Sequence, residues 1–255
     1  DFLVLDETDR MLDMGFTEQI EDVLHHMPEK RQTLLFSATL PKNIERIANN
    51  YLSSPERVAV SPPSAPAQNI KQDMKRLSEQ EKFPTLLNEL GERDGSIIIF
   101  VKTKHGTEKL ATRLANEGHS TSAIHGDLRQ NKRDRVIAAF RKKSYRILVA
   151  TDVAARGLDI PHIEHVINYD LPQCAEDYIH RIGRTARAGA EGAALNFITP
   201  SDRGKWSAID RLLNPSAQQS ERRGARKAES GQGRPGGARR RKPRNRNGQA
   251  RRTAA

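Results

Sequence analysis

Short apolar runs alternate with helical patterns of apolar residues between residues 97 and 213. The runs have the length and composition of buried strands, and the patterns between them are typical of helices that pack on a sheet. This alternation predicts a parallel sheet with crossover helices, and therefore an α/β domain. The expected strands are Ile70 to Met74, Ile97 to Val101, Thr121 to His125, Ile147 to Ala150, His165 to Asn168 and Ala194 to Ile198, and the expected helices are Thr107 to Leu114, Gln130 to Phe140 and Ala175 to Arg184.

A proline-rich stretch precedes this domain. The segment from Ser53 to Ala67 contains Pro55, Pro62, Pro63 and Pro66, and proline continues neither a helix nor a central strand. We therefore interpret residues 53–66 as a linker and residues 67–213 as the α/β domain.

The first 52 residues contain only two strand candidates, Phe2 to Leu5 and Thr33 to Phe36. Two strands are too few for an independent sheet core. We therefore expect residues 1–52 to be the C-terminal remnant of a preceding domain, with Asp1 at a cut edge.

The charge of the chain is concentrated in its last segment. Residues 221–255 contain 13 lysines and arginines against two glutamates, which accounts for the net charge of +11. From Asn214 onward no apolar side chain is larger than alanine, so burial cannot offset the entropy of ordering the chain. We expect residues 214–255 to be a disordered basic tail that binds nucleic acid through its phosphates. A tail that only aids solubility, or one that binds another acidic partner, remains an alternative.

Composition excludes some classes of protein. With 36% apolar residues the chain can bury a core, but its longest apolar run, Ile97 to Val101, is far shorter than the ~20 residues of a membrane helix. The single cysteine, Cys174, allows no intramolecular disulfide, as is usual in a reducing compartment. We expect a cytoplasmic protein without a membrane partner.

Polar residues follow three of the expected strands. Asp6 and Glu7 follow the first, Ser37 and Thr39 the second, and Thr151 follows Ile147 to Ala150. Because open α/β sheets bind ligands at the carboxyl ends of their strands, these residues are candidates for a site. Each cluster alone is more simply explained as the start of an ordinary loop, because short polar residues are common there.

Adjacent carboxylates after a buried strand can divide the work of hydrolysis. Asp6 is the candidate that holds Mg²⁺ through its water shell, and Glu7 is the candidate base for an attacking water. The alternative is a helix N-terminus whose dipole is complemented by Glu7 and Asp9.

A second polar group lies between Tyr178 and Arg187. If the helix persists that far, His180, Arg184 and Arg187 share one face, and two guanidiniums there suit a γ-phosphate. The alternative is a solvated basic face. Gln130 and Arg133 similarly lie at i and i+3 on an expected helix after Gly126, which would let backbone approach a phosphate; an ordinary exposed helix face is the alternative.

Taken in order, these motifs resemble those of the DEAD-box family of superfamily 2 RNA helicases, of the bacterial type. The resemblance covers residues 1–212 and departs from the family pattern at Thr8, where alanine is usual, and at Ala186, where glycine is usual. The matching segments are Val4 to Phe16, Ser37 to Thr39, Ile98 to Lys104, His125 to Asp127, Gln130 to Arg133, Thr151 to Asp159 and His180 to Gly189.

The resemblance implies two RecA-like domains, the first represented by its remnant and the second complete, with ATP and Mg²⁺ between them and RNA across both. It assigns Mg²⁺ to Asp6, water activation to Glu7, interdomain coupling to Asp9 and His180, and coupling of hydrolysis to unwinding to Ser37 and Thr39. By the same resemblance Asp159 contacts the ribose, Arg184 and Arg187 reach the γ-phosphate, and the RNA backbone is contacted by Thr103, Gly126, Gln130, Arg133 and Thr151.

We therefore expect the C-terminal portion of an ATP-dependent RNA helicase. The phosphate-binding loop with its lysine is absent from these 255 residues, so we expect the fragment to be deficient in ATP hydrolysis. A non-catalytic RNA-binding module or regulator is the second hypothesis, and a DNA-directed helicase is the third. The sequence identifies no RNA substrate and no protein partner, whether ribosomal or from RNA decay.

Overall fold

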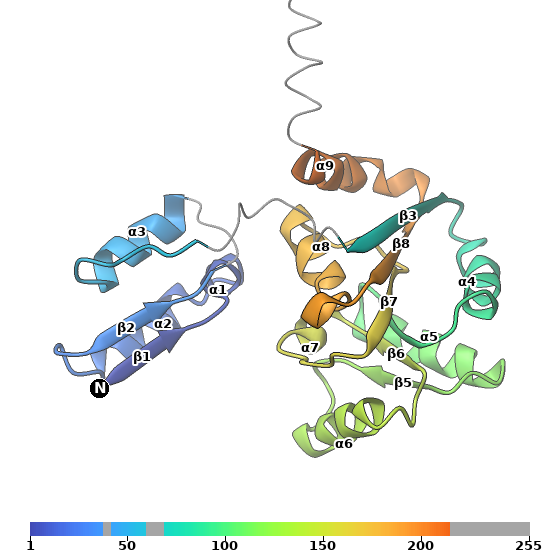
Figure 1. Ribbon diagram of the computed structural model, residues 1–255, viewed down its shortest axis with the longest axis horizontal. Coiled ribbons are helices and arrows are strands. Elements are labelled where there is room, and N and C mark those ends of the chain that lie inside the picture. The colour runs from blue at the N-terminus through green and yellow to red at the C-terminus, as the bar shows by residue number, and fades with distance from the viewer. Residues whose placement is uncertain (38–41, 60–68, 215–255) are drawn as a thin grey trace, which may run out of the picture. The chain divides into compact units, whose positions relative to one another are not determined.

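The computed structural model describes residues 1–37, 42–59 and 69–214, and its strands form two parallel sheets (Figure 1). Thr39, half of the predicted linker (60–66) and the predicted tail after Asn214 lie outside the described residues. The sequence-based predictions for these segments therefore stay predictions.

The first sheet has two strands, β1 (Phe2–Leu5) and β2 (Gln32–Leu35), paired in parallel. Its helices are α1 (Thr8–Asp13), α2 (Thr17–His25) and α3 (Lys42–Tyr51). Because side chains alternate along a strand, Leu3 and Leu5 face a small core with Ile20 and Leu24 of α2, whereas Phe2 and Val4 are 72% and 56% exposed. Both strands were predicted, the second displaced by one residue.

The second sheet has six strands, all parallel, in the order β3-β8-β7-β4-β6-β5. The central strand β4 is buried at every residue, as expected for a parallel sheet covered on both faces. All six strands were predicted, with ends that differ by one or two residues. They are β3 (Ile70–Arg76), β4 (Ser96–Phe100), β5 (Thr121–Ile124), β6 (Ile147–Ala150), β7 (Ile163–Asn168) and β8 (Gly192–Ile198).

Two hydrophobic clusters cover the two faces of this sheet. On one face α4 (Lys82–Gly91) and α5 (Lys104–Asn116) pack against β4 and β6. On the other face lie α6 (Gln130–Arg141), α7 (Asp152–Ala155), α8 (Ala175–Ile182) and α9 (Arg203–Leu213). Two short 3-10 helices, η1 (Arg187–Gly189) and η2 (Pro200–Asp202), follow α8 and β8. This is the predicted α/β architecture of a RecA-like domain.

The helices differ more from prediction than the strands. The predicted helix to Arg184 ends at Ile182, with Gly183 at its C-cap, because glycine is a poor helix former and commonly ends a helix. Helices α2, α3, α4, α7 and α9 were not predicted. Among the described residues, no helix has the length and apolar character required to cross a membrane.

Candidate nucleotide and RNA site

The acidic box forms a tight turn at the carboxyl end of β1. Glu7 has φ 51° and ψ 43°, a left-handed conformation that is uncommon for a residue other than glycine. Its amide donates to Asp6 Oδ1 at 2.8 Å, and its carbonyl accepts from Arg10 and Met11 at the start of α1. The turn leaves the carboxylate of Asp6 exposed and that of Glu7 partly exposed.

Two of the predicted polar clusters lie together at this edge. The Asp9 amide donates to Ser37 Oγ at 3.2 Å, and the Thr8 amide donates to the Phe36 carbonyl at 3.1 Å. Thr8 itself is fully buried, and its hydroxyl donates to the Leu5 carbonyl. The hydroxyl is therefore satisfied inside the fold, which explains why a threonine fits between the acids.

The acidic box fits a hydrated Mg²⁺. Mg²⁺ takes oxygen ligands and usually keeps several waters, so one or two carboxylates suffice, and Asp6 and Glu7 offer carboxylates that are open to solvent. Asp6 would hold the ion, which would neutralise phosphate charge when bound. Among the described residues there is no group of three or more metal-ligating side chains, so a closed all-protein metal site is not formed in this part of the chain.

Arg184 and Arg187 lie beyond the end of α8, each anchored by backbone carbonyls. Arg184 donates to the carbonyls of His180 and Leu158, both at 3.1 Å. Arg187 donates to the Gly183 carbonyl at 3.1 Å and to Asp159 Oδ1 at 2.8 Å. The structure thus brings together Arg187 and Asp159, the predicted γ-phosphate and ribose contacts. The predicted single face required α8 to continue past Arg184, but α8 ends at Ile182; Arg184 follows it, and Arg187 begins the 3-10 helix η1.

Charge repulsion and burial act on this pair of arginines. Burial, followed by the neighbouring charge of Arg187, lowers the pKa of Arg184 from its ordinary value. A guanidinium stays protonated at any physiological pH, so Arg184 is a partly buried cation beside a second cation, Arg187, and the two together favour an anion. A phosphate placed there would relieve the repulsion between the two arginines.

Arg181 was missed by the sequence analysis, although it lies inside the arginine-rich motif. It is 2% exposed and donates to both carboxylate oxygens of Asp152, at 2.5 and 2.8 Å. Its remaining nitrogen donates to Asn168 Oδ1 at 2.9 Å and to the Asp170 carbonyl at 2.6 Å, and its guanidinium lies 4.8 Å from the centre of the Phe100 ring. It therefore fixes α8 to the residue that follows Thr151.

A second buried polar contact supports α8. The Tyr178 hydroxyl donates to Gln72 Oε1 at 2.7 Å and accepts from Asn196 Nδ2 at 3.1 Å. Burial raises the pKa of Tyr178 to about 12. The phenol thus stays neutral and ties α8 to strands β3 and β8.

The predicted RNA-backbone residues follow β4, β5 and β6, which are neighbours in the sheet. Thr103 caps α5, with its hydroxyl accepting from the Gly106 amide at 3.0 Å. Thr151 is buried between β6 and α7, where it precedes Asp152. A methyl group at Gly126 would meet nothing closer than Lys104 Cε at 3.7 Å, so the protein's own packing does not require that glycine.

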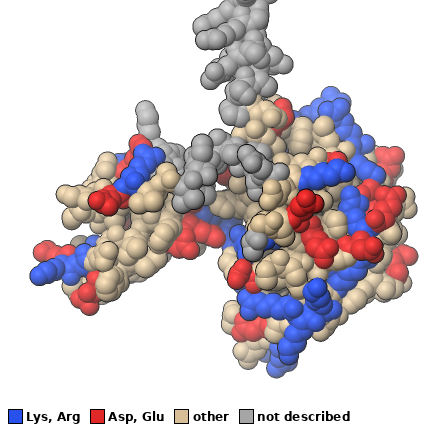
Figure 2. Space-filling model, in the orientation of Figure 1, with Lys and Arg blue, Asp and Glu red and all other residues tan. Residues whose placement is uncertain are grey.

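Gln130 and Arg133 begin α6. Gln130 donates to Asp134 at 2.7 Å, and Arg133 donates to the Ala154 carbonyl of α7 at 3.2 Å. Both line an open pocket of about 620 Å³ between α6 and Leu158. Lys and Arg gather over α6 on the face shown in Figure 2. The pocket and its basic surroundings are suited to a polyanion.

Comparison with protein families identifies matches to both parts of the chain. Residues 1–47 match the DEAD/DEAH box helicase family, and residues 81–189 match the helicase conserved C-terminal domain. The DEAD-box ATP-dependent RNA helicase CshA of Geobacillus kaustophilus is 47% identical over 210 residues, covering 82% of this chain and 45% of that protein. CshA of Bacillus subtilis is 45% identical over 209 residues, covering 82% and 42%. The chain thus spans less than half the length of these relatives.

Solved structures show the same fold. Saccharomyces cerevisiae Dbp5 bound to RNA and ADP BeF3 superposes with a TM-score of 0.77 at 37% identity, over 84% of this chain and 57% of that one. A DEAD box protein from Methanococcus jannaschii has a TM-score of 0.56 at 39% identity, over 84% of this chain and 58% of that one.

Proposed function

The chain belongs to the DEAD-box family of RNA helicases, and we propose that the protein that carries it unwinds or remodels RNA duplexes by ATP-driven closure of two RecA-like domains. The observation that carries the proposal is the pairing of Arg187 with Asp159 beside Arg184, three residues that match the family's nucleotide contacts. The named relatives, the CshA helicases, are ATP-dependent RNA helicases.

The residues of the first sheet would act on the water and the metal. Asp6 would hold hydrated Mg²⁺, and Glu7 would accept the proton of the attacking water. Asp9, held next to Ser37 by the hydrogen bond from its amide, would couple this edge with His180, and Ser37 and Thr39 would link hydrolysis to unwinding. These roles are supported by the match to the family and by the shared sheet edge.

The residues of the second sheet would stabilise charge and hold RNA. Arg184 and Arg187 would reach the γ-phosphate, where such arginines are worth about 10³ to 10⁵ in rate, and Asp159 would contact the ribose. Contacts from Thr103, Gly126, Gln130, Arg133 and Thr151 would fix one RNA strand through its backbone, without much sequence preference.

We propose that the 255 residues alone do not turn over ATP, because they contain no Gly-Lys-Ser or Gly-Lys-Thr loop for the phosphates. Both proposals are tested by measuring RNA-stimulated release of phosphate from ATP, once for this chain and once for the full-length protein. We expect activity only in the full-length protein. If the full-length protein binds RNA but does not hydrolyse ATP, the result would favour a non-catalytic RNA-binding module. A location in the cytoplasm remains a prediction.

A further inference from the structure

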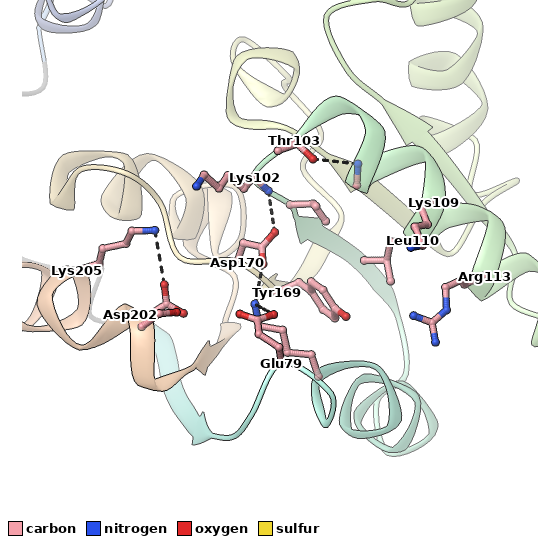
Figure 3. Close-up of a pocket in the computed structure, with 14 residues that line it drawn as sticks. Glu79, Lys102, Thr103, Lys109, Leu110, Arg113, Tyr169, Asp170, Asp202 and Lys205 are labelled. Carbon is pink, nitrogen blue, oxygen red and sulfur yellow. Dashed lines mark hydrogen bonds and ion pairs between the residues drawn. The ribbon is translucent and has the colours of Figure 1, made fainter.

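A second pocket lies at the carboxyl edge of the six-stranded sheet, on the side of β4 away from β6. It has a volume of about 390 Å³ and is lined by the loops that follow β3, β4, β7 and β8, together with α5 and α9. Figure 3 shows its residues, among them Thr103, at the boundary with the predicted RNA contacts. None of its other lining residues belongs to the nucleotide and RNA site described above.

The carboxylates of this pocket are already paired. Asp170 accepts from Lys82 Nζ at 2.8 Å and from the Lys102 amide at 2.9 Å, and Lys82, which is 3% exposed, also lies 3.1 Å from Glu79. Asp202 accepts from the Thr199 hydroxyl at 2.6 Å, in the capping box of η2. These acids are therefore used within the protein, and they do not make the pocket a cation site.

The cations of the pocket are in excess. Lys102 and Lys109 are both exposed, and neither ammonium group forms an ion pair with the described part of the chain. Arg113, one turn beyond Lys109, lies with its guanidinium 3.6 Å from the centre of the Phe83 ring. Stacking fixes the guanidinium without neutralising it. The pocket therefore attracts an anion.

The backbone adds to this attraction. The 13-residue helix α5 begins directly after Thr103, its N-cap, which lines the pocket, and its N-terminal dipole favours negative charge. In Figure 3 Lys109, Leu110 and Arg113 extend along this helix, and the Tyr169 ring lies between them and Asp170. A phosphate here would meet the basic side chains of α5, and the Tyr169 ring would lie beside the attached nucleoside.

We propose that this pocket holds a phosphate group of the bound RNA strand, beyond the contact at Thr103. RNA is favoured over another polyanion because the pocket is continuous with a residue that matches the RNA-backbone positions of the family, and because a strand leaving Thr103 along this sheet edge reaches Lys102 and Lys109. The proposal rests on the proposed RNA-binding function and extends the strand's path across the sheet edge from β4 to β7.

The test compares the salt dependence of oligouridine binding by the full 255-residue chain and by the double variant Lys102→Ala/Lys109→Ala. Each phosphate contact on a single strand contributes about 0.7 to the slope of log K against log salt. We expect the slope to become less steep by about 0.7 in the double variant, because one phosphate contact is lost. A matched lysine variant, Lys71→Ala near the amino end of β3, where the side chain is 78% exposed, should keep the original slope.

Strand length gives a second readout. The decrease in slope caused by the double variant should be seen with a long oligouridine. It should be absent with an oligouridine too short to extend beyond Thr103. An unchanged slope in a chain that binds RNA would overturn the pocket proposal alone. Absence of RNA binding by the unaltered chain would overturn the proposed function as well. If the double variant binds RNA as the unaltered chain does but loses affinity for an oligoglutamate peptide, the RNA assignment would be overturned. The pocket would then be identified as a site for acidic protein segments.

Discussion

Arg181 donates two hydrogen bonds to the carboxylate of Asp152, at 2.5 and 2.8 Å. Asp152 directly follows Thr151, a predicted RNA contact, and Arg181 lies one turn before Arg184, a predicted phosphate contact. The ion pair therefore joins the two kinds of site through a single bidentate contact. Arg181 is a positioning residue, since its own nitrogens are all used within the protein.

We expect Arg181→Met to lower the free energy of unfolding by about 3 kcal/mol or more, because it leaves the carboxylate of Asp152 without its partner in a largely buried place. Urea unfolding measures the change. Adding Asp152→Asn should restore part of the loss, because the unpaired charge is removed. Arg211→Met, at the exposed end of α9, is the control, and a loss of equal size there would contradict the role of the pair.

Ala186 has φ 55° and ψ 34°, a left-handed conformation that costs a residue with a Cβ about 1 to 2 kcal/mol. We expect Ala186→Gly to raise the free energy of unfolding by about 1 kcal/mol, after the added entropy of glycine in the unfolded chain is subtracted. Ala190→Gly, at φ −70°, should instead be destabilising. Equal effects of the two substitutions would show that the left-handed backbone is not the cause.

Two histidines should make stability depend on pH. Burial lowers the pKa of His162, which hydrogen-bonds the Phe140 carbonyl at 2.9 Å, and burial likewise lowers the pKa of His165. As the pH falls, these histidines are therefore protonated in the unfolded chain before they are protonated in the folded chain. The free energy of unfolding is thus highest above pH about 6.5 and decreases below it. Replacing both with glutamine should flatten this acid limb, as measured by urea unfolding between pH 7.5 and 5. His105→Gln, on an exposed position of α5, should not.

In the full-length protein, Arg184→Ala should reduce ATP turnover by about 10³-fold or more, because it removes a cation that is held in place before phosphate arrives. Its hydrogen bonds go to two carbonyls that border the site, so RNA affinity without nucleotide should change little. Steady-state ATPase assays with RNA provide the rate. A comparable loss for Arg211→Ala would indicate a general effect on the fold.

The strands were predictable because a buried parallel strand is a nearly continuous apolar run, as β4 is from Ile97 to Phe100. Helices α4 and α9 were harder, since α4 carries Pro84 in its first turn and α9 has a largely polar sequence. The candidate site was predictable where residues follow a strand directly, as Asp6 and Thr151 do.

The partners of these residues were not predictable. Arg181 contacts Asp152 and Asn168, which follow β6 and end β7, and Asn196 of β8 joins Tyr178. These strands are brought together by the order β3-β8-β7-β4-β6-β5, which differs from the order in the sequence. The same order forms the pocket at Lys109 from four separate loops, and no local pattern in the sequence encodes it.

The outward face of β1 has a practical consequence for work on this chain. Phe2 and Val4 stand exposed on a sheet of only two strands, and open apolar strands template association between copies. Solutions of the 255-residue chain should therefore form concentration-dependent clusters, which light scattering would detect. Phe2→Lys should disperse them, and working with dilute samples of that variant would separate true ligand affinities from self-association.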